Sequence, residues 1–222
     1  MKSTVGPALG EGVYTPSDAA KILRIPVSKV WRWVGTGEEG TWIIDGWSLE
    51  GTRGLNFLAL VELFVVEKLR GLRVPMQRIR LARELLANRF DTPFPFALRG
   101  LLSDGKSILI QLEGQDKSSA LRLDGSDQIA FAEIVLEFCK RIDFDPETEL
   151  ADMYWPLGKG RSVVVDPHHA FGQPRIDGTN IPTETIVSMI LAGDTVATVA
   201  SVYNLEQEEV RDAVEFERQL AA

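Results

Sequence analysis

The feature that most constrains the fold of this chain is a stretch that predicts a helix with apolar side chains on nearly every side. Asn56 is suited to cap the start of this helix, and Gly71 is suited to end it. Between them lie nine large apolar residues: Phe57, Leu58, Leu60, Val61, Leu63, Phe64, Val65, Val66 and Leu69. Such a helix has to be buried all round. Two ways to bury it stay open, the core of the chain itself or a seam between two copies.

A pair of short helices is predicted before it, in "YTPSDAAKILRIPVSKVWRWV", residues 14–34. Thr15 is a good N-cap, Pro16 fits the first helical position, and Asp18 takes the capping-box position. After a tight turn, Pro26 begins the second helix. Its apolar stripe is predicted to be Val27, Val30, Trp31 and Val34. Its outer face is predicted to carry Ser28, Lys29, Arg32 and Trp33. This order, with a basic outer face, is typical of a helix-turn-helix.

Residues 35–54 are punctuated by glycines, and "TWIIDGWSL" has strand character with Asp45-Gly46 as the predicted hairpin turn. We interpret this stretch as a β-wing. Arg53 at its end is placed to meet a phosphate, whereas Lys29 and Arg32 are suited to phosphates or guanine edges. Ser28 is a weaker candidate of the same kind, and Trp33 is assigned either to the interface or to the core. The alternative is that these charges are only solvated.

A further helix is predicted to begin at Pro75 and to bury Met76, Ile79, Ala82 and Leu86. In the order of these elements, and in "GLRVPMQRI", residues 13–90 resemble the DNA-binding domain of MerR-type regulators. The resemblance implies that the second helix enters the major groove and that the wing grips the DNA backbone. The chain then departs from that family, because the prolines of "DTPFPFALRG" cannot continue into the long helix that usually follows.

We expect a mainly α (α+β) protein of three parts: a DNA-binding domain (1–92), a small α+β region (93–160) and a helical domain (161–222). The middle part predicts two strands, a helix, a loop and a strand, at residues 107–112, 119–124, 126–142, 143–160 and 161–167. Its candidates for an effector pocket are Tyr154, Trp155 and Cys139, with core packing as the favoured alternative. The acids of the loop fit no calcium-loop template, so a solvated loop is favoured over a metal site.

The carboxyl-terminal part has the most specific motif, "GQPRIDGTNIP", followed by predicted helices at about 183–192, 195–203 and 206–219. Asp194 is the predicted cap of the middle helix. Residues 166–217 resemble a small family of unknown-function domains, with Asn180 where an arginine is usual. Members of that family resemble antitoxins of type II toxin–antitoxin pairs, and those with an added DNA-binding domain are similar to an atypical VapB-type group. The resemblance implies a toxin partner of the PIN-domain ribonuclease class.

The charge of the chain is divided by sign. Residues 1–99 hold 14 basic and 10 acidic side chains and residues 100–222 hold 10 and 22, so net charges of +4 and −12 make up the total of −8. The last predicted helix carries six acids in twelve residues, from Glu206 to Glu217. Acids oppose phosphate contacts, so this helix is not expected to read DNA and is free for a protein partner. The candidate partner-binding residues are Arg175, Asn180, Glu208, Glu209 and Asp212.

Other features narrow the class of protein. A single cysteine excludes a disulfide framework and fits a reducing cytoplasm. Neither a secretory signal nor a membrane span is expected. Catalytic, metal and cofactor motifs are missing, so an enzyme is disfavoured.

The sequence therefore predicts an antitoxin that represses its own operon by binding operator DNA, as a homodimer or within a larger toxin–antitoxin assembly, and that blocks a ribonuclease toxin by contact. The alternative is a ligand-responsive MerR-like regulator with residues 100–165 as the sensor.

Overall fold

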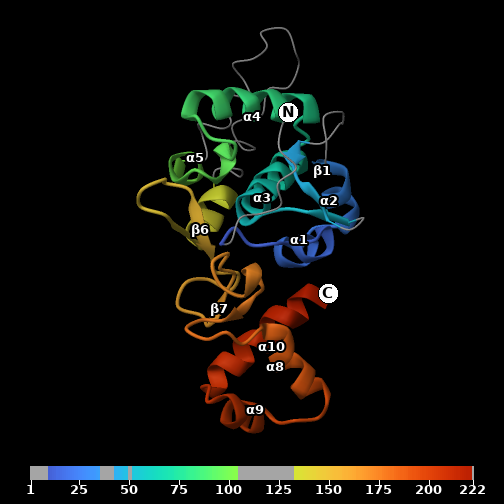
Figure 1. Cartoon of the computed structure of the whole chain (residues 1–222), viewed down its shortest axis with the longest axis vertical. Coiled ribbons are helices and arrows are strands. Elements are labelled where there is room, and N and C mark those ends of the chain that lie inside the picture. Colours follow the sequence, from blue (N-terminus) through green and yellow to red (C-terminus); the bar gives the residue numbers. More distant parts are fainter. Residues whose placement is uncertain (1–9, 36–42, 50–51, 105–132, 222) are drawn as a thin grey trace.

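The structure is a computed structural model that describes residues 10–35, 43–49, 52–104 and 133–221. The molecule is elongated, with α1–α5 at one end and α8–α10 at the other (Figure 1). The helices span Pro16–Leu23 (α1), Val27–Trp33 (α2), Phe57–Gly71 (α3), Met76–Phe90 (α4), Arg99–Asp104 (α5), Thr183–Leu191 (α8), Val196–Tyr203 (α9) and Gln207–Ala221 (α10), with 3-10 turns at Pro95–Ala97 (η1) and Ala170–Gly172 (η2). The predicted mainly helical class is confirmed.

The strands are short and pair two by two. They span Val34–Gly35 (β1), Ile44–Asp45 (β2), Trp47–Leu49 (β3), Thr52–Gly54 (β4), Ile142–Phe144 (β5), Ala151–Tyr154 (β6), Val163–Val164 (β7) and Arg175–Ile176 (β8). The β1–β2 pair is parallel, and the other three pairs are antiparallel.

The apolar helix α3 is buried by its own chain. Its apolar side chains from Phe57 to Leu69 are at most 2% exposed, apart from the half-buried Leu58 and Phe64. The carboxylate of Glu62 is buried with them and accepts from Arg83 at 2.9 Å and from the Phe96 backbone N–H at 3.1 Å. A buried charge of this kind is tolerated because it is paired and hydrogen-bonded. The core of one chain therefore accounts for this helix without a second copy.

The helix pair forms as predicted. The Thr15 hydroxyl accepts from the Asp18 backbone N–H at 3.2 Å, and the Asp18 carboxylate accepts from the Thr15 N–H at 2.9 Å, so the capping box is complete. Arg24 closes α1 in the left-handed conformation, at φ 55°, and α2 begins after Pro26. The capping box thus satisfies backbone groups at the start of α1, and the left-handed Arg24 turns the chain from α1 toward α2.

A β-hairpin is present where the wing is predicted, but the predicted turn is wrong. The antiparallel hairpin is β3–β4, with Ser48 opposite Arg53, and the residues that join its strands, 50–51, lie outside the described residues. The predicted turn at Asp45-Gly46 is instead the point where the chain passes from β2 to β3. A side chain at Gly46 would lie 2.6 Å from the Gly54 carbonyl oxygen, so only glycine fits this crossing.

The middle part differs from the prediction at two points. The helix predicted over 126–142 ends at residue 139, and Ile142 instead begins β5. The predicted loop over 143–160 contains the hairpin β5–β6, which pairs Ile142 with Tyr154. The predicted strands at 107–112 and 119–124 lie outside the described residues, and residues 133–139 are helical. Tyr154 packs in the core against Phe138, whose ring stacks on Phe64 at a centroid distance of 3.7 Å. The predicted core packing of Tyr154 is confirmed.

The three carboxyl-terminal helices form a second, smaller core around Ile176, Ile186, Val199, Val210 and Ala213. All three predicted helices are confirmed within two residues at each end. The cap of α9 is Thr195 rather than Asp194, because the Thr195 hydroxyl accepts from the Thr198 N–H at 3.1 Å.

Candidate nucleic-acid and partner interfaces

The two tryptophans of α2 face opposite to the prediction. Trp33 is 4% exposed and packs in the main core, whereas Trp31 is 41% exposed. Because Trp33 is buried, its predicted place on the outer face is wrong. Ser28 and Arg32 are exposed, as predicted.

The predicted DNA-binding charges fall into two groups. The Lys29 ammonium donates to both carboxylate oxygens of Glu67, at 2.9 and 3.0 Å, and lies 5.8 Å from the Trp33 ring. Arg53 donates to the backbone carbonyls of Trp31 and Val34, both at 2.6 Å, so it joins the wing to the end of α2. Arg32 makes no hydrogen bond or ion pair within the described part of the chain. Of the five predicted DNA-binding residues, Arg32 is the cation most open to a phosphate.

A basic groove runs beside Arg32, with a volume of about 410 Å³. It is lined by Lys29, Arg32, Trp33, Arg70, Met76 and Arg80. Arg70 and Arg80 were not predicted to belong to this surface, because they lie on either side of the α3–α4 turn, far along the chain from α2. The Arg70 guanidinium also donates to the Val74 carbonyl at 2.5 Å, which stiffens that turn. Four cations around one groove make a favourable site for a polyanion backbone.

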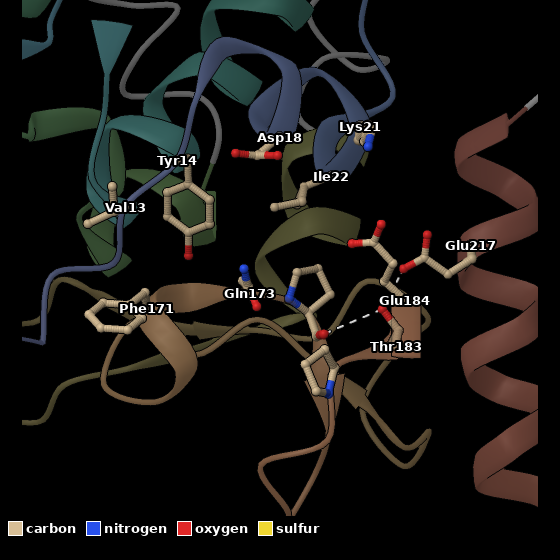
Figure 2. A pocket seen from close by; sticks show the side chains of 12 residues that line it. Val13, Tyr14, Asp18, Lys21, Ile22, Phe171, Gln173, Thr183, Glu184 and Glu217 are labelled. Carbon is tan, nitrogen blue, oxygen red and sulfur yellow. Dashed lines mark hydrogen bonds between the residues drawn. The ribbon is translucent and has the colours of Figure 1, made fainter. Parts of the chain in front are cut away.

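A small pocket of about 150 Å³ lies between α1 and the carboxyl-terminal part (Figure 2). Figure 2 shows Asp18, Lys21 and Ile22 on the α1 side, and Gln173, Thr183 and Glu184 across from them. The Thr183 hydroxyl donates to Glu217 of α10 at 2.5 Å. The pocket therefore borders both halves of the molecule.

Tyr14 lies at the centre of the contact between the amino-terminal part of the molecule and the carboxyl-terminal part that begins near residue 161. This residue is 2% exposed, and its hydroxyl has no hydrogen-bond partner among the described residues. Burial raises the pKa of the Tyr14 hydroxyl, as do the charges of Asp166 and Asp18. The ring packs over Gly172, and the Val13 backbone N–H donates to the Phe171 carbonyl at 2.8 Å. The amino-terminal segment is thereby fixed against η2.

Arg175 is part of the interior. Its guanidinium donates to Asp166 at 2.6 Å and to the Thr179 carbonyl at 2.8 Å, and the residue is 5% exposed. Burial raises the pKa of the Asp166 carboxyl, but hydrogen bonds from Arg175 and from the His168 and His169 groups lower it by more, so the net shift is downward. Arg175 is thus buried with its guanidinium turned toward the interior, which argues against the predicted partner contact. Asn180, on the same segment, is exposed.

Asp212 is also interior, whereas other acids of α10 are outside. The Asp212 carboxylate, 1% exposed, accepts from Arg161 at 2.9 and 2.5 Å and from the Ser162 N–H at 2.8 Å. Glu208 is open to solvent and pairs with Arg211 at 3.0 Å. The Glu209 carboxylate accepts from the Glu206 N–H at 2.7 Å, at the start of α10. Asp212 therefore orients α10, and Glu208 is the candidate that a partner can reach.

The chain is similar to known proteins, both over its carboxyl-terminal part and along most of its length. Residues 163–216 match a family model described as "Protein of unknown function (DUF433)". A curated protein of Mycobacterium tuberculosis (strain ATCC 25618 / H37Rv), named "Putative antitoxin VapB45", is 27% identical over 224 residues, which cover 91% of this chain and 92% of that protein. The X-ray crystal structure of Rv2018 from Mycobacterium tuberculosis is similar with a TM-score of 0.70 and 26% identity, covering 90% of this chain and 96% of that one. The predicted resemblance to an unknown-function family is confirmed.

The described residues contain neither a candidate membrane span nor a candidate metal-binding cluster. No helix there is both long and apolar enough to cross a membrane. Within the same ranges, no group of three or more His, Cys, Asp or Glu side chains is placed to hold a metal ion.

Proposed function

We propose that this chain is the antitoxin of a type II toxin–antitoxin pair, a non-enzymatic protein that binds operator DNA as a dimer and blocks a PIN-like ribonuclease toxin by direct contact. The observation that carries the proposal is the similarity, along 91% of the chain, to a protein named as an antitoxin. The division of charge between the two halves supports it, because DNA and a protein partner then have separate surfaces.

The proposed DNA surface is the exposed face of α2 together with the adjacent groove. Ser28 and Arg32 point away from the core, and Arg70 and Arg80 extend the positive surface toward α4. Arg32 has the free guanidinium needed for a phosphate or for a guanine edge. Lys29 joins this surface only if DNA competes with Glu67 for its ammonium. Arg53 holds the wing against the end of α2, so the wing lies beside the proposed DNA surface.

A gel-shift titration tests the DNA half of the proposal, with a duplex that covers the region upstream of the chain's own reading frame. We expect Arg32→Ala to weaken binding by about tenfold, the loss of roughly one charged contact. Glu208→Ala is the matched control, because it removes an exposed charge from the other half, and we expect affinity equal to or above that of the wild type. Unchanged binding by Arg32→Ala would contradict the assignment of this face.

Co-expression with the neighbouring reading frame tests the toxin half. We expect a complex that stays together during size-exclusion chromatography, and a ribonuclease activity in the neighbour's product that falls to background as this chain is added in equimolar amount. Separate elution of the two proteins, or activity unaffected by this chain, would reject the antitoxin function.

A further inference from the structure

The helices α8 and α9 present apolar side chains that the chain's own core does not use. Leu191 is 82% exposed and Val202 is 61% exposed, the first at the end of α8 and the second on α9. The core of this half takes Ile186, Met189 and Ile190 from α8, and within the described residues Val187 and Leu191 lie outside it. Val187 and Leu191 are four residues apart, so they lie on one face of the helix. Leu191, with the half-buried Val187 beside it, leaves apolar surface of this short helix uncovered, which is typical of an interaction surface.

The charged residues along the chain through α8 and α9 are all of one sign. Between Arg175 and Arg211 the sequence has no lysine or arginine. The charged residues of that stretch are all acids: Asp177, Glu184, Asp194, Glu206, Glu208 and Glu209. Glu184 lies one turn before Val187, and Asp194 follows Leu191 after the turn at Gly193. We call Leu191 of α8 and Val202 of α9, with the acids Asp194 and Glu206, the α8–α9 surface.

The sign of the charge decides which occupant fits the α8–α9 surface. Nucleic acid is disfavoured, because every acid here adds repulsion from phosphates. A second copy is also disfavoured, since a two-fold contact places a patch against itself and would set acid against acid. A protein with an apolar centre and a basic rim complements both the apolar face and the charge. Figure 1 places α9 at the end of the molecule remote from α2, so such a partner can bind without covering the DNA surface.

We infer that the α8–α9 surface is where the chain holds the toxin of the proposed function, with Leu191 as the central contact. The inference rests on that proposed function and gives it a location. It replaces the sequence-based candidates Arg175 and Asp212, whose side chains are turned inward. The complementary surface on the toxin presents an apolar hollow surrounded by lysines or arginines.

The test measures binding between the purified full-length chain and the purified product of the neighbouring reading frame by titration calorimetry. We expect Leu191→Asp to weaken the complex at least tenfold, because a charge in the apolar centre of an interface is left without a partner. Leu85→Asp is the matched control: Leu85 is 40% exposed on α4, and we expect the affinity of this variant to equal that of the wild type. Leu191→Asp is also expected to keep its thermal midpoint and its operator affinity, since Leu191 lies outside the core.

The outcomes separate the two proposals. If the wild type binds and Leu191→Asp binds equally well, the location is wrong and the antitoxin function stands. If the wild type itself does not bind, both fall together. Sedimentation of the chain alone tests whether a second copy binds here instead. Conversion of a dimer into a monomer by Leu191→Asp would assign this surface to a second copy and overturn the inference. Loss of affinity on Asp194→Lys, growing as salt is lowered, would support it.

Discussion

Arg161 and Asp212 lie 51 positions apart in the chain and are joined by two hydrogen bonds, at 2.9 and 2.5 Å. Arg161 precedes β7, and Asp212 lies in the middle of α10. The same carboxylate accepts from the Ser162 N–H at 2.8 Å, and Arg161 also reaches Glu215 at 2.6 Å. The pair therefore holds the last helix onto the strand that begins the carboxyl-terminal half.

The first prediction concerns what this pair contributes to stability. We expect Arg161→Ala to lower the free energy of unfolding by about 1–3 kcal/mol, because it leaves the buried Asp212 charge with the Ser162 N–H and without its cation. Glu215→Ala removes the partly exposed partner of the same guanidinium and is expected to cost less than about 1 kcal/mol. Urea denaturation followed by circular dichroism measures both. Equal losses in the two variants would show that the Arg161–Asp212 contact stabilises the fold no more than the Arg161–Glu215 contact does.

The second prediction concerns acid. Burial raises the pKa of the Asp212 carboxyl, but the hydrogen bonds from Arg161 and Ser162 lower it by more, so the folded-state pKa lies below the ordinary value. Such a group stabilises the fold above its unfolded pKa of about 3.9, and the contribution is lost as the pH falls through the folded pKa. We therefore expect stability to drop as the pH falls below about 4, and Asp212→Asn to show a smaller drop.

Urea midpoints at a series of pH values between neutral and strongly acidic would measure this difference. Asp177→Asn is the control, since Asp177 is exposed and lies on the same half of the molecule. A drop of the same size in all three proteins would mean that Asp212 is not a source of the acid sensitivity.

The sequence predicted the helices well because their signals are local. The capping box of Thr15 and Asp18 needs only four residues, and each helix from α8 to α10 has its own apolar periodicity. Which way α2 faces was not predictable in the same way. The predicted stripe includes Val34, but the helix ends at Trp33 and Val34 belongs to β1. In a seven-residue helix, two tryptophans two positions apart lie on nearly opposite faces, so the periodicity allows either one to face the core. The fold decides between them, because Trp33 packs in the main core.

The candidate site was predictable only in part, for a related reason. Composition predicted a basic front and an acidic back, and Ser28, Arg32 and Glu208 are indeed exposed. Composition does not reveal that a charge is already bonded within the chain. Lys29 is paired with Glu67, 38 positions away, and Asp212 is paired with Arg161. Each side chain is therefore less available to bind DNA or a protein partner than the sequence predicts. Such pairings depend on the fold, and no regular spacing of residues in the sequence predicts them.

The third prediction tests the contact between the two halves. Gly172 has a φ of 83°, and a side chain there would lie 2.2 Å from the Tyr14 hydroxyl oxygen. We expect Gly172→Ala to lower the free energy of unfolding by about 1–3 kcal/mol through overpacking and backbone strain. Gly178→Ala is the control, because its φ of 70° is also left-handed but nothing lies within 4 Å of the added carbon. A loss no larger than that of the control would show that the ring moves aside freely.

The fourth prediction uses Tyr14 itself. Its hydroxyl is buried without a partner within the described residues, which costs free energy in the folded state. Tyr14→Phe keeps the ring and removes this cost, so we expect stability to be unchanged or to rise by about 0.5–1 kcal/mol. Thermal and urea unfolding would measure it. A loss of more than about 1 kcal/mol would reveal a hydrogen bond to this hydroxyl in solution.

The last prediction separates the roles of Arg32 and Arg53 on the proposed DNA surface. Arg32 is free to neutralise a phosphate, whereas Arg53 donates to the Trp31 and Val34 carbonyls and orients the wing. Each neutralised phosphate adds about 0.9 to the slope of log K against log salt. We therefore expect Arg32→Ala to reduce that slope by about 0.9, and Arg53→Lys to weaken operator binding with a smaller change in slope. Gel shifts at four salt concentrations give both slopes. Equal reductions would place Arg53 on a phosphate and show that its contacts to α2 break when DNA binds.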